Sequence, residues 1–247
     1  MRIIPRDVKF KTFPVPETNL DGEVYMRRRP NADWRLICIP GAPSHTHLFR
    51  RLLQLAPDSL EVFVVNRLGY GENHDEAVLD FNDQIKIVEP LLKDKRVILL
   101  GASYGGALSL NAALKYRGHI EGVVTSAALI QEPRDYAKTM VDFDIPAIIT
   151  DNAPKKLQRM RAEIHGRRPQ IGPLLDRVNQ LDIPIEVLHG TLDTLVSRDD
   201  AEHLIKVIGD NARYKEITGG THYIELQFPQ QIFKAVNRLK KRIEARV

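Results

Sequence analysis

The chain has 247 residues, of which 43% are hydrophobic and 28% charged, and this composition is typical of a globular protein with a full hydrophobic core. No apolar run reaches the roughly 18–20 residues that span a bilayer, and the charged N-terminal stretch has no apolar signal segment, so we expect neither a membrane protein nor a secreted one. The single cysteine, Cys38, lies in an apolar run and cannot form an internal disulfide, which favours a cytoplasmic location.

The net charge of +4 raises the question of a nucleic-acid partner. The basic residues are, however, dispersed among acidic ones. The two densest basic clusters, 155–168 and 240–242, contain no alternating aromatic residues on which bases could stack. We therefore expect no nucleic-acid partner and interpret both clusters as solvated helix faces.

Apolar runs alternate with amphipathic segments along most of the chain. Two loosely alternating stretches, 8–15 and 22–29, predict antiparallel strands at the start. Buried strands are then expected at 34–39, 61–66, 96–100, 121–128, 184–189 and 213–217, with amphipathic helices around 48–53, 78–92, 107–113, 198–208 and 228–243. This alternation predicts an α/β fold with a mostly parallel central sheet that is flanked by helices on both faces.

The alternation stops between residues 131 and 181. This stretch is polar, contains five prolines, and includes short helical segments such as 157–164 and 174–181. We therefore expect one domain, with a core formed by 1–130 and 182–247 and a helical insertion at 131–181.

Residues 96–113 contain the most informative motif. Ser103 lies between a buried strand and a helix of small residues, with Gly101 and Gly105 two positions away on either side. This is the G-x-S-x-G nucleophile elbow, in which side chains at the glycine positions would clash with the neighbouring strand and helix. A glycine-rich turn with an incidental serine is the alternative, but the strand before and the helix after favour a nucleophile.

A serine hydroxyl needs a base to remove its proton, and the base needs an acid to orient it. In this architecture the acid and then the histidine follow the serine along the chain. Asp193 comes directly after the strand at 184–189, and His222 lies in a glycine-containing loop after the last strand. Simple turn and loop roles are the alternatives, while Asp199 and Asp200 are interpreted as acids of a first helical turn.

The oxyanion formed during acyl transfer needs two N–H donors. The elbow provides one at Tyr104, the residue after the serine. The loop that follows the strand at 34–39 provides the other. Because Pro43 has no N–H, we predict Ala42 as the second donor, with Ser44 as the next choice.

With these motifs the chain resembles the α/β-hydrolase superfamily over nearly its whole length. The elbow, the segment 189–193, the loop around His222 and the segment 66–71 are similar to that family's pattern. Two positions depart from it, since the early loop begins with Pro40 in place of His, and Asn66 stands where Asp is usual. The resemblance implies that 131–181 is a lid that covers the site and sets the substrate pocket. It also disfavours halide or epoxide chemistry, because those members use an Asp nucleophile.

We expect neither a metal nor a nucleotide cofactor. His45 and His47 are candidates for the pocket mouth, but no cysteine or carboxylate cluster completes a metal site around them. Gly69 and Gly71 are not followed by the further glycine of a dinucleotide-binding loop. Candidates for an apolar acyl pocket, with ordinary packing as the alternative, are Phe49, Tyr104, Met140, Phe143 and Met160.

The sequence therefore predicts a cofactor-independent serine esterase that acts on a small or medium acyl ester through Ser103, His222 and Asp193. Hydrolysis of a thioester, amide or carbon–carbon bond and acyl transfer use the same triad. A non-catalytic small-molecule-binding protein on this fold is the alternative of another class. If the stretch 155–168 faces the pocket, an anionic substrate is favoured. The sequence leaves open whether the chain forms a homodimer.

Overall fold

The computed structural model describes residues 7–71, 76–131 and 154–246. An eight-stranded sheet forms its centre, in the order β1-β2-β4-β3-β5-β6-β7-β8. The strands are β1 (Val8–Pro14), β2 (Asp21–Arg27), β3 (Trp34–Ile39), β4 (Leu60–Asn66), β5 (Arg96–Ala102), β6 (Ile120–Ser126), β7 (Ile185–Gly190) and β8 (Ala212–Ile217). Of these strands, β2 pairs antiparallel with both of its neighbours, β1 and β4, whereas β3 to β8 pair in parallel with one another. The predicted mostly parallel α/β fold is thereby confirmed.

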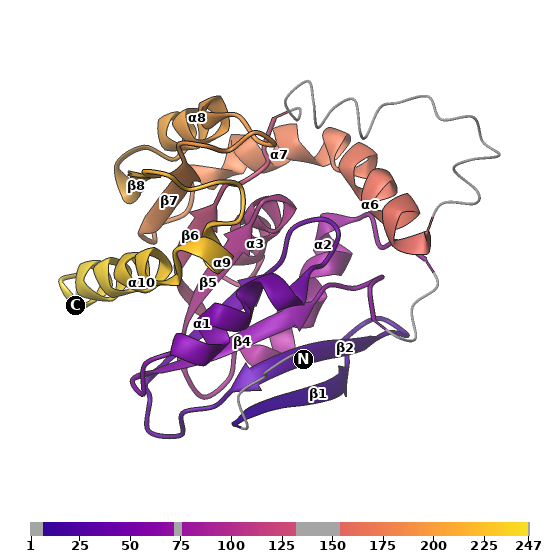
Figure 1. Cartoon of the computed structure of the whole chain (residues 1–247), viewed down its shortest axis with the longest axis horizontal. Coiled ribbons are helices and arrows are strands. Elements are labelled where there is room, and N and C mark those ends of the chain that lie inside the picture. Colours follow the sequence, from indigo (N-terminus) through magenta and orange to yellow (C-terminus); the bar gives the residue numbers. More distant parts are fainter. Residues whose placement is uncertain (1–6, 72–75, 132–153, 247) are drawn as a thin grey trace.

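Helices cover both faces of this sheet (Figure 1), which explains why β3 and β7 are buried along their whole lengths. One face packs against α3 (Tyr104–Lys115), α7 (Arg168–Val178) and α8 (Arg198–Ile208). The other packs against α1 (Arg50–Leu55), α9 (Ile224–Gln227) and α10 (Pro229–Glu244). The odd- and even-numbered residues of each strand point to opposite faces, so each contributes to both halves of the core.

The helix expected at 78–92 differs from the prediction. It consists of a short α2 (Phe81–Gln84) followed by the 3-10 segment η2 (Ile85–Leu91). Pro90 lies inside this segment and cannot donate a backbone hydrogen bond, so a regular α-helix cannot continue through it. A further 3-10 segment, η1 (Thr46–Phe49), precedes α1, and η3 (Gly209–Asn211) follows α8.

In the stretch predicted as an insertion, the described part contains α6 (Lys155–Gly166) and α7. Residues 132–153, including Met140 and Phe143, lie outside the described residues. Asp200 connects the start of this stretch to α8, because its carboxylate accepts the N–H groups of Ile130 at 2.8 Å and Gln131 at 3.0 Å. Asp200 is therefore a buried connecting residue, whereas the helix cap itself is Ser197. The division into core and lid remains a prediction.

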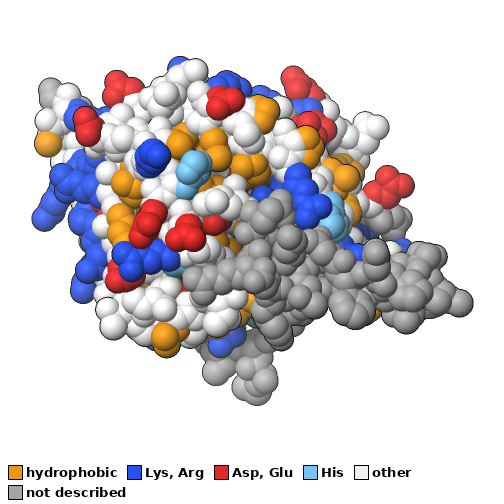
Figure 2. All heavy atoms as spheres, turned by 90° about the horizontal axis from the view of Figure 1, so that it is seen from above, with side chains coloured by type: hydrophobic (Ala, Val, Ile, Leu, Met, Phe, Trp, Pro, Cys, Tyr) orange, Lys and Arg blue, Asp and Glu red, His pale blue; other side chains and the backbone are white. Residues whose placement is uncertain are grey.

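The interpretation of 155–168 as a solvated helix face is wrong for its inner side. Glu163 and Arg167 are buried, Arg159 donates to the Gly69 carbonyl at 2.6 Å, and Arg167 donates to the Gln131 carbonyl at 2.6 Å. In the second cluster, Arg242 donates to the Asn211 carbonyl at 2.8 Å. On the face shown in Figure 2, the described basic and acidic side chains lie interspersed among hydrophobic ones.

Candidate active site

The elbow has the backbone geometry that its sequence predicts. Ser103 lies between β5 and α3 with φ 52° and ψ −122°, a conformation that is strained for a residue with a side chain. A Cβ atom on Gly105 would lie 2.1 Å from the Ile39 carbonyl oxygen, and one on Gly101 would lie 2.2 Å from the Gly105 oxygen. The N–H of Ser103 donates to the Ser126 carbonyl at 2.9 Å. These contacts give both glycines a steric cause and hold the serine at the end of the strand.

Asp193 and His222 lie in direct contact. The Nδ1 atom of His222 is 2.9 Å from Oδ2 of Asp193, whose side chain is fully buried. The other carboxylate oxygen accepts the N–H groups of Leu195 at 2.8 Å and Val196 at 3.0 Å. Burial alone would raise the pKa of Asp193, but the bonds from His222 and the two N–H groups outweigh it, so the pKa lies below its usual value. Asp193 is therefore ionised at neutral pH and can only accept hydrogen bonds.

The loops that carry these two residues are packed against each other at glycines. Gly219 has φ 74°, which turns the chain back toward the sheet after β8. Leu192 donates to the Gly220 carbonyl at 2.8 Å, and Thr191 donates to the Ile217 carbonyl at 3.1 Å. A Cβ atom on Gly190 would lie 2.3 Å from the Gly220 oxygen, so the contact requires glycine there.

Ser103 and His222 line the same cavity, which has a volume of about 270 Å³. Most of its described lining is apolar and comes from the early loop and η1, the ends of β5 and β6, α6 and the segment after β7. These residues are Gly41, Ala42, Pro43, Leu48, Ala102, Leu129, Met160, Ile164, Leu195 and Val196. Tyr223, His45 and Glu225 complete it. The structure thus places a hydroxyl and an imidazole at one apolar hollow beside the carboxyl ends of the strands.

The predicted oxyanion donors flank the serine. A Cβ atom on Gly41 would lie 2.9 Å from Cβ of Ser103, so the early loop passes directly over the nucleophile. Ala42 lines the cavity, and Tyr104 begins α3, where the first N–H groups have no partner within the helix. Ser44, the second choice, is buried and its hydroxyl accepts the N–H of Arg67 at 3.0 Å.

The other pocket candidates divide into two groups. Met160 and His45 line the cavity, whereas Phe49 and Tyr104 are not among its lining residues and are buried in the two core clusters. For Phe49 and Tyr104 the structure therefore supports the alternative, which is ordinary packing in the core. Burial, with the charges of Lys156 and His47, lowers the pKa of His45 to about 4, so this histidine is neutral at pH 7.

Glu225 is a cavity residue that sequence reasoning missed. It follows His222 by three positions and is buried, and its Oε2 atom has no hydrogen-bond partner among the described residues. Burial raises the pKa of Glu225 to about 7, against the lowering effect of His222 and Ser126. No motif indicated it, because a lone glutamate in a short amphipathic helix usually points to solvent.

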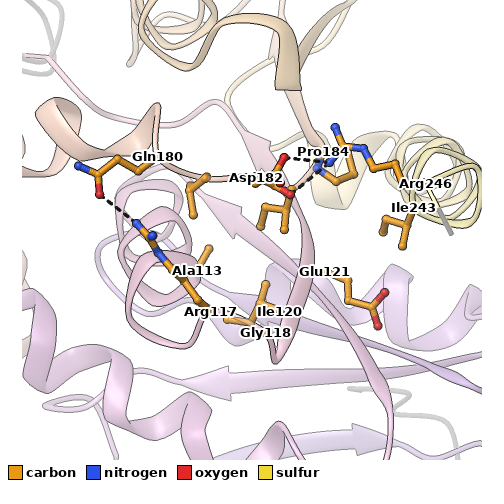
Figure 3. Close-up of a pocket in the computed structure, with 12 residues that line it drawn as sticks. Ala113, Arg117, Gly118, Ile120, Glu121, Gln180, Asp182, Pro184, Ile243 and Arg246 are labelled. Atoms are coloured by element: carbon orange, nitrogen blue, oxygen red, sulfur yellow. Dashed lines mark hydrogen bonds and ion pairs between the residues drawn. The ribbon is translucent and has the colours of Figure 1, made fainter.

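A second hollow of about 400 Å³ lies at the opposite end of the strands from the Ser103 cavity, near the starts of β6 and β7 (Figure 3). Its charged groups are already paired, since Arg117 donates to Gln180 at 3.0 Å and Arg246 lies 3.7 Å from Asp182. It contains no serine or histidine, so the cavity at Ser103 is the stronger candidate site.

Within the described ranges, no group of three or more His, Cys, Asp or Glu side chains is arranged to hold a metal ion. Over the same ranges, no helix has the length and apolar character needed to cross a bilayer.

The chain is similar in sequence to one protein family and to several known hydrolases. Residues 35–147 match a protein family described as alpha/beta hydrolase fold. The chain is 31% identical over 111 residues to a proline iminopeptidase of Thermoplasma volcanium, a match that covers 42% of this chain and only 37% of that protein. It is 22% identical to a monoglyceride lipase of Rattus norvegicus, over 100% of this chain and 95% of the lipase.

Solved structures share the fold at lower identity. The 2-hydroxy-6-oxo-6-phenylhexa-2,4-dienoate hydrolase from Rhodococcus sp. strain RHA1 superposes with a TM-score of 0.75 at 13% identity, over 95% of this chain and 99% of that chain. At this level of identity the likeness concerns the fold, and the activity has to be argued from the site.

Proposed function

We propose that the chain is a serine hydrolase of the α/β-hydrolase superfamily that cleaves a small or medium carboxylic ester through an acyl-enzyme on Ser103, and the family match over residues 35–147 supports this. The observation that carries the proposal is the pairing of a buried, ionised Asp193 with His222, on the wall of the cavity that Ser103 also lines.

The protonation state of the pair supports a role for His222 as general base. The carboxylate of Asp193 only accepts hydrogen bonds, so the proton between the two groups is assigned to Nδ1 of His222. The free electron pair then lies on Nε2, which takes the proton of Ser103 as the hydroxyl attacks the substrate carbonyl. Nε2 later returns this proton to the departing alkoxide, and a water molecule repeats the sequence to release the acid.

The oxyanion of each tetrahedral intermediate would be bound by the N–H groups of Ala42 and Tyr104. Both flank Ser103, one on the loop that passes over it and one at the start of α3. The positive end of the α3 dipole adds to this stabilisation.

The size and lining of the cavity support the substrate class. About 270 Å³ lies just below the usual range for drug-sized pockets and fits a short or medium acyl group. From α6, Met160 and Ile164 line the cavity. No basic residue of the stretch 155–168 lines it. We therefore favour an uncharged acyl group over the anionic substrate that this stretch suggested. The proposal keeps a cytoplasmic location, with no nucleic-acid or membrane partner.

Amide hydrolysis is the second candidate, because the match to a protein named proline iminopeptidase includes 31% identity over 111 residues. The triad would be the same, and the leaving group would be an amine protonated by His222. Peptidyl anilides assayed beside esters of equal acyl length distinguish the two.

The decisive test combines a fluorophosphonate probe with p-nitrophenyl esters of graded chain length. We expect the probe to label Ser103 and the wild-type protein to hydrolyse the shorter esters. Ser103→Ala should lose labelling and turnover while it keeps its fold, and Ser109→Ala, a buried serine two turns along α3, is the matched control. Wild-type turnover by Ser103→Ala would refute the mechanism, and a wild-type protein without adduct or turnover would favour the non-catalytic binding protein.

A further inference from the structure

A buried ion pair connects α6 to the end of β4. The guanidinium of Arg67 and the carboxylate of Glu163 are both fully buried and meet through two parallel bonds, Nη1 to Oε1 and, at 2.9 Å, Nη2 to Oε2. The Tyr70 hydroxyl donates to Oε2 of Glu163 at 2.6 Å, and the Gln84 amide donates to Oε1 at 3.3 Å. Four donor groups therefore satisfy the buried carboxylate of Glu163, which lowers the cost of burying its charge.

The same arginine reaches both segments that flank the nucleophile. Its Nη2 donates to the Gly41 carbonyl at 3.0 Å, directly before Ala42 in the early loop. Its guanidinium carbon lies 4.6 Å from the ring centroid of Tyr104, the residue that follows Ser103. Arg67 thus touches the loop and the helix start to which the proposed function assigns the two oxyanion donors.

Glu163 lies on the helix that forms one wall of the cavity. It lies on α6 between Met160 and Ile164, and these two residues line the cavity. A second contact fixes the same helix, because Arg159 donates to the Gly69 carbonyl at 2.6 Å. These contacts with the segment after β4 therefore fix the position of α6 relative to the rest of the cavity wall.

We propose that Arg67 and Glu163 are positioning residues of this site, which hold the Ala42 loop against Ser103 and set how closely α6 covers the acyl group. A pair of apolar side chains would pack α6 without the cost of burying two charges. Bidentate hydrogen bonds, unlike apolar contacts, fix the relative orientation of the two side chains. An oxyanion site needs such fixed positions because its donors must lie about 3 Å from the oxygen. This inference rests on the proposed serine hydrolase mechanism.

The chain contains a matched control. Arg35 and Glu61 also form a buried ion pair, at 2.8 Å, and Arg35 likewise bonds to carbonyl oxygens and lies over an aromatic ring, 4.5 Å from the centroid of Phe63. Both residues lie at the starts of β3 and β4, at the opposite end of these strands from the cavity. Breaking this pair should cost stability without moving the site.

The experiment compares Glu163→Gln with Glu61→Gln, well below their melting temperatures, on esters with acyl chains of graded length. We expect Glu163→Gln to lower kcat about 10- to 100-fold, less than the loss of a whole oxyanion donor, with a small change in KM for short esters. Affinity for an alkyl boronic acid, which forms a tetrahedral adduct on the serine, should fall by a similar factor. The preferred acyl length should increase as α6 loosens. Glu61→Gln should lower the melting temperature and leave kcat, boronate affinity and acyl preference unchanged.

Equal effects of the two variants on kcat, or an unchanged kcat and acyl preference in folded Glu163→Gln, would overturn the inference. If Glu163→Gln fails to fold, Tyr70→Phe removes one hydrogen bond and leaves the ion pair in place. It should lower kcat by about 2- to 5-fold, the expected effect of one weakened contact, and an unchanged kcat would refute the positioning role. Failure of the proposed function is distinguishable, because the wild-type protein would then neither react with the fluorophosphonate nor hydrolyse any ester.

Discussion

Gly190→Ala tests whether the close packing of two loops brings the acid and the histidine together. A Cβ atom at this position would lie 2.3 Å from the Gly220 oxygen and 2.7 Å from the Thr221 oxygen. Ordinary van der Waals contact begins near 3.4 Å, so the backbone of residues 220–221 has to move by about 1 Å. His222 follows directly and has to move with it.

The expected effect on catalysis is larger than the effect on stability. A displacement of about 1 Å in a reacting group can lower a rate about 100-fold. Overpacking of this kind costs about 1–3 kcal/mol, which for a domain of this length lowers the melting temperature by roughly 2–12 °C. The folded variant should therefore be nearly inactive at temperatures where it is still native.

The assay measures kcat and KM on a short ester, with thermal unfolding followed by circular dichroism. Gly172→Ala is the control, because a Cβ atom at Gly172 has nothing within 4 Å, and we expect wild-type activity from it. If Gly190→Ala retains wild-type kcat and melting temperature, the two loops are not packed as described. A loss of activity that merely follows the unfolded fraction would refute the geometric explanation.

Two further substitutions test the charges of the site. Asp193→Asn should lower kcat about 10⁴-fold with the fold retained, because an amide favours the wrong tautomer of His222, and a loss under about tenfold would contradict this role. Glu225→Gln should change how stability depends on pH. Since folding raises the pKa of Glu225 from 4.5 to about 7, its stabilising contribution is complete below pH 4.5 and is lost as the pH rises to about 7. The variant should therefore gain on the order of 3 kcal/mol of unfolding free energy relative to the wild-type protein between pH 4 and pH 8, measured by denaturant unfolding. An equal difference at both pH values would show that Glu225 does not titrate in this range.

The elbow was predictable because its cause is local. A strand, a turn and a helix of small residues are adjacent in the chain, and the clashes that require Gly101 and Gly105 involve that same segment and the neighbouring strand. The positions of the buried strands along the chain were predictable for a similar reason, since each of these strands is apolar throughout and is bounded by turns. The pairing of Asp193 with His222 followed from their places after β7 and β8, which are adjacent in the sheet.

The positions of Glu163 and Glu225 were not predictable from their local sequence. Glu163 meets Arg67 across 96 residues, and its neighbours on α6 include several basic residues that suggest a solvated helix. Glu225 lies in a helix of four residues, too short for its hydrophobic spacing to indicate an inner face. In both cases burial depends on which distant segment covers the residue, and hydrophobic periodicity carries no information about that.

The strand order also explains why Glu225 is buried beneath the histidine loop. In the sheet, β6 and β7 lie between β5 and β8, so the ends of the strands that precede Ser103 and His222 are about 14 Å apart. The histidine loop has to reach back over the ends of β7 and β6, and α9 follows it into the space above them. An acid placed after β6 would occupy this space, but β6 ends in Ser126 and the sequence offers no acid there. The carboxyl group of Glu225 lies beside Ser126 instead, on the inner side of the turn that presents His222 to the cavity. Because Asp193 already holds the imidazole, this second carboxyl group has no orienting task, and its burial raises its pKa to about 7.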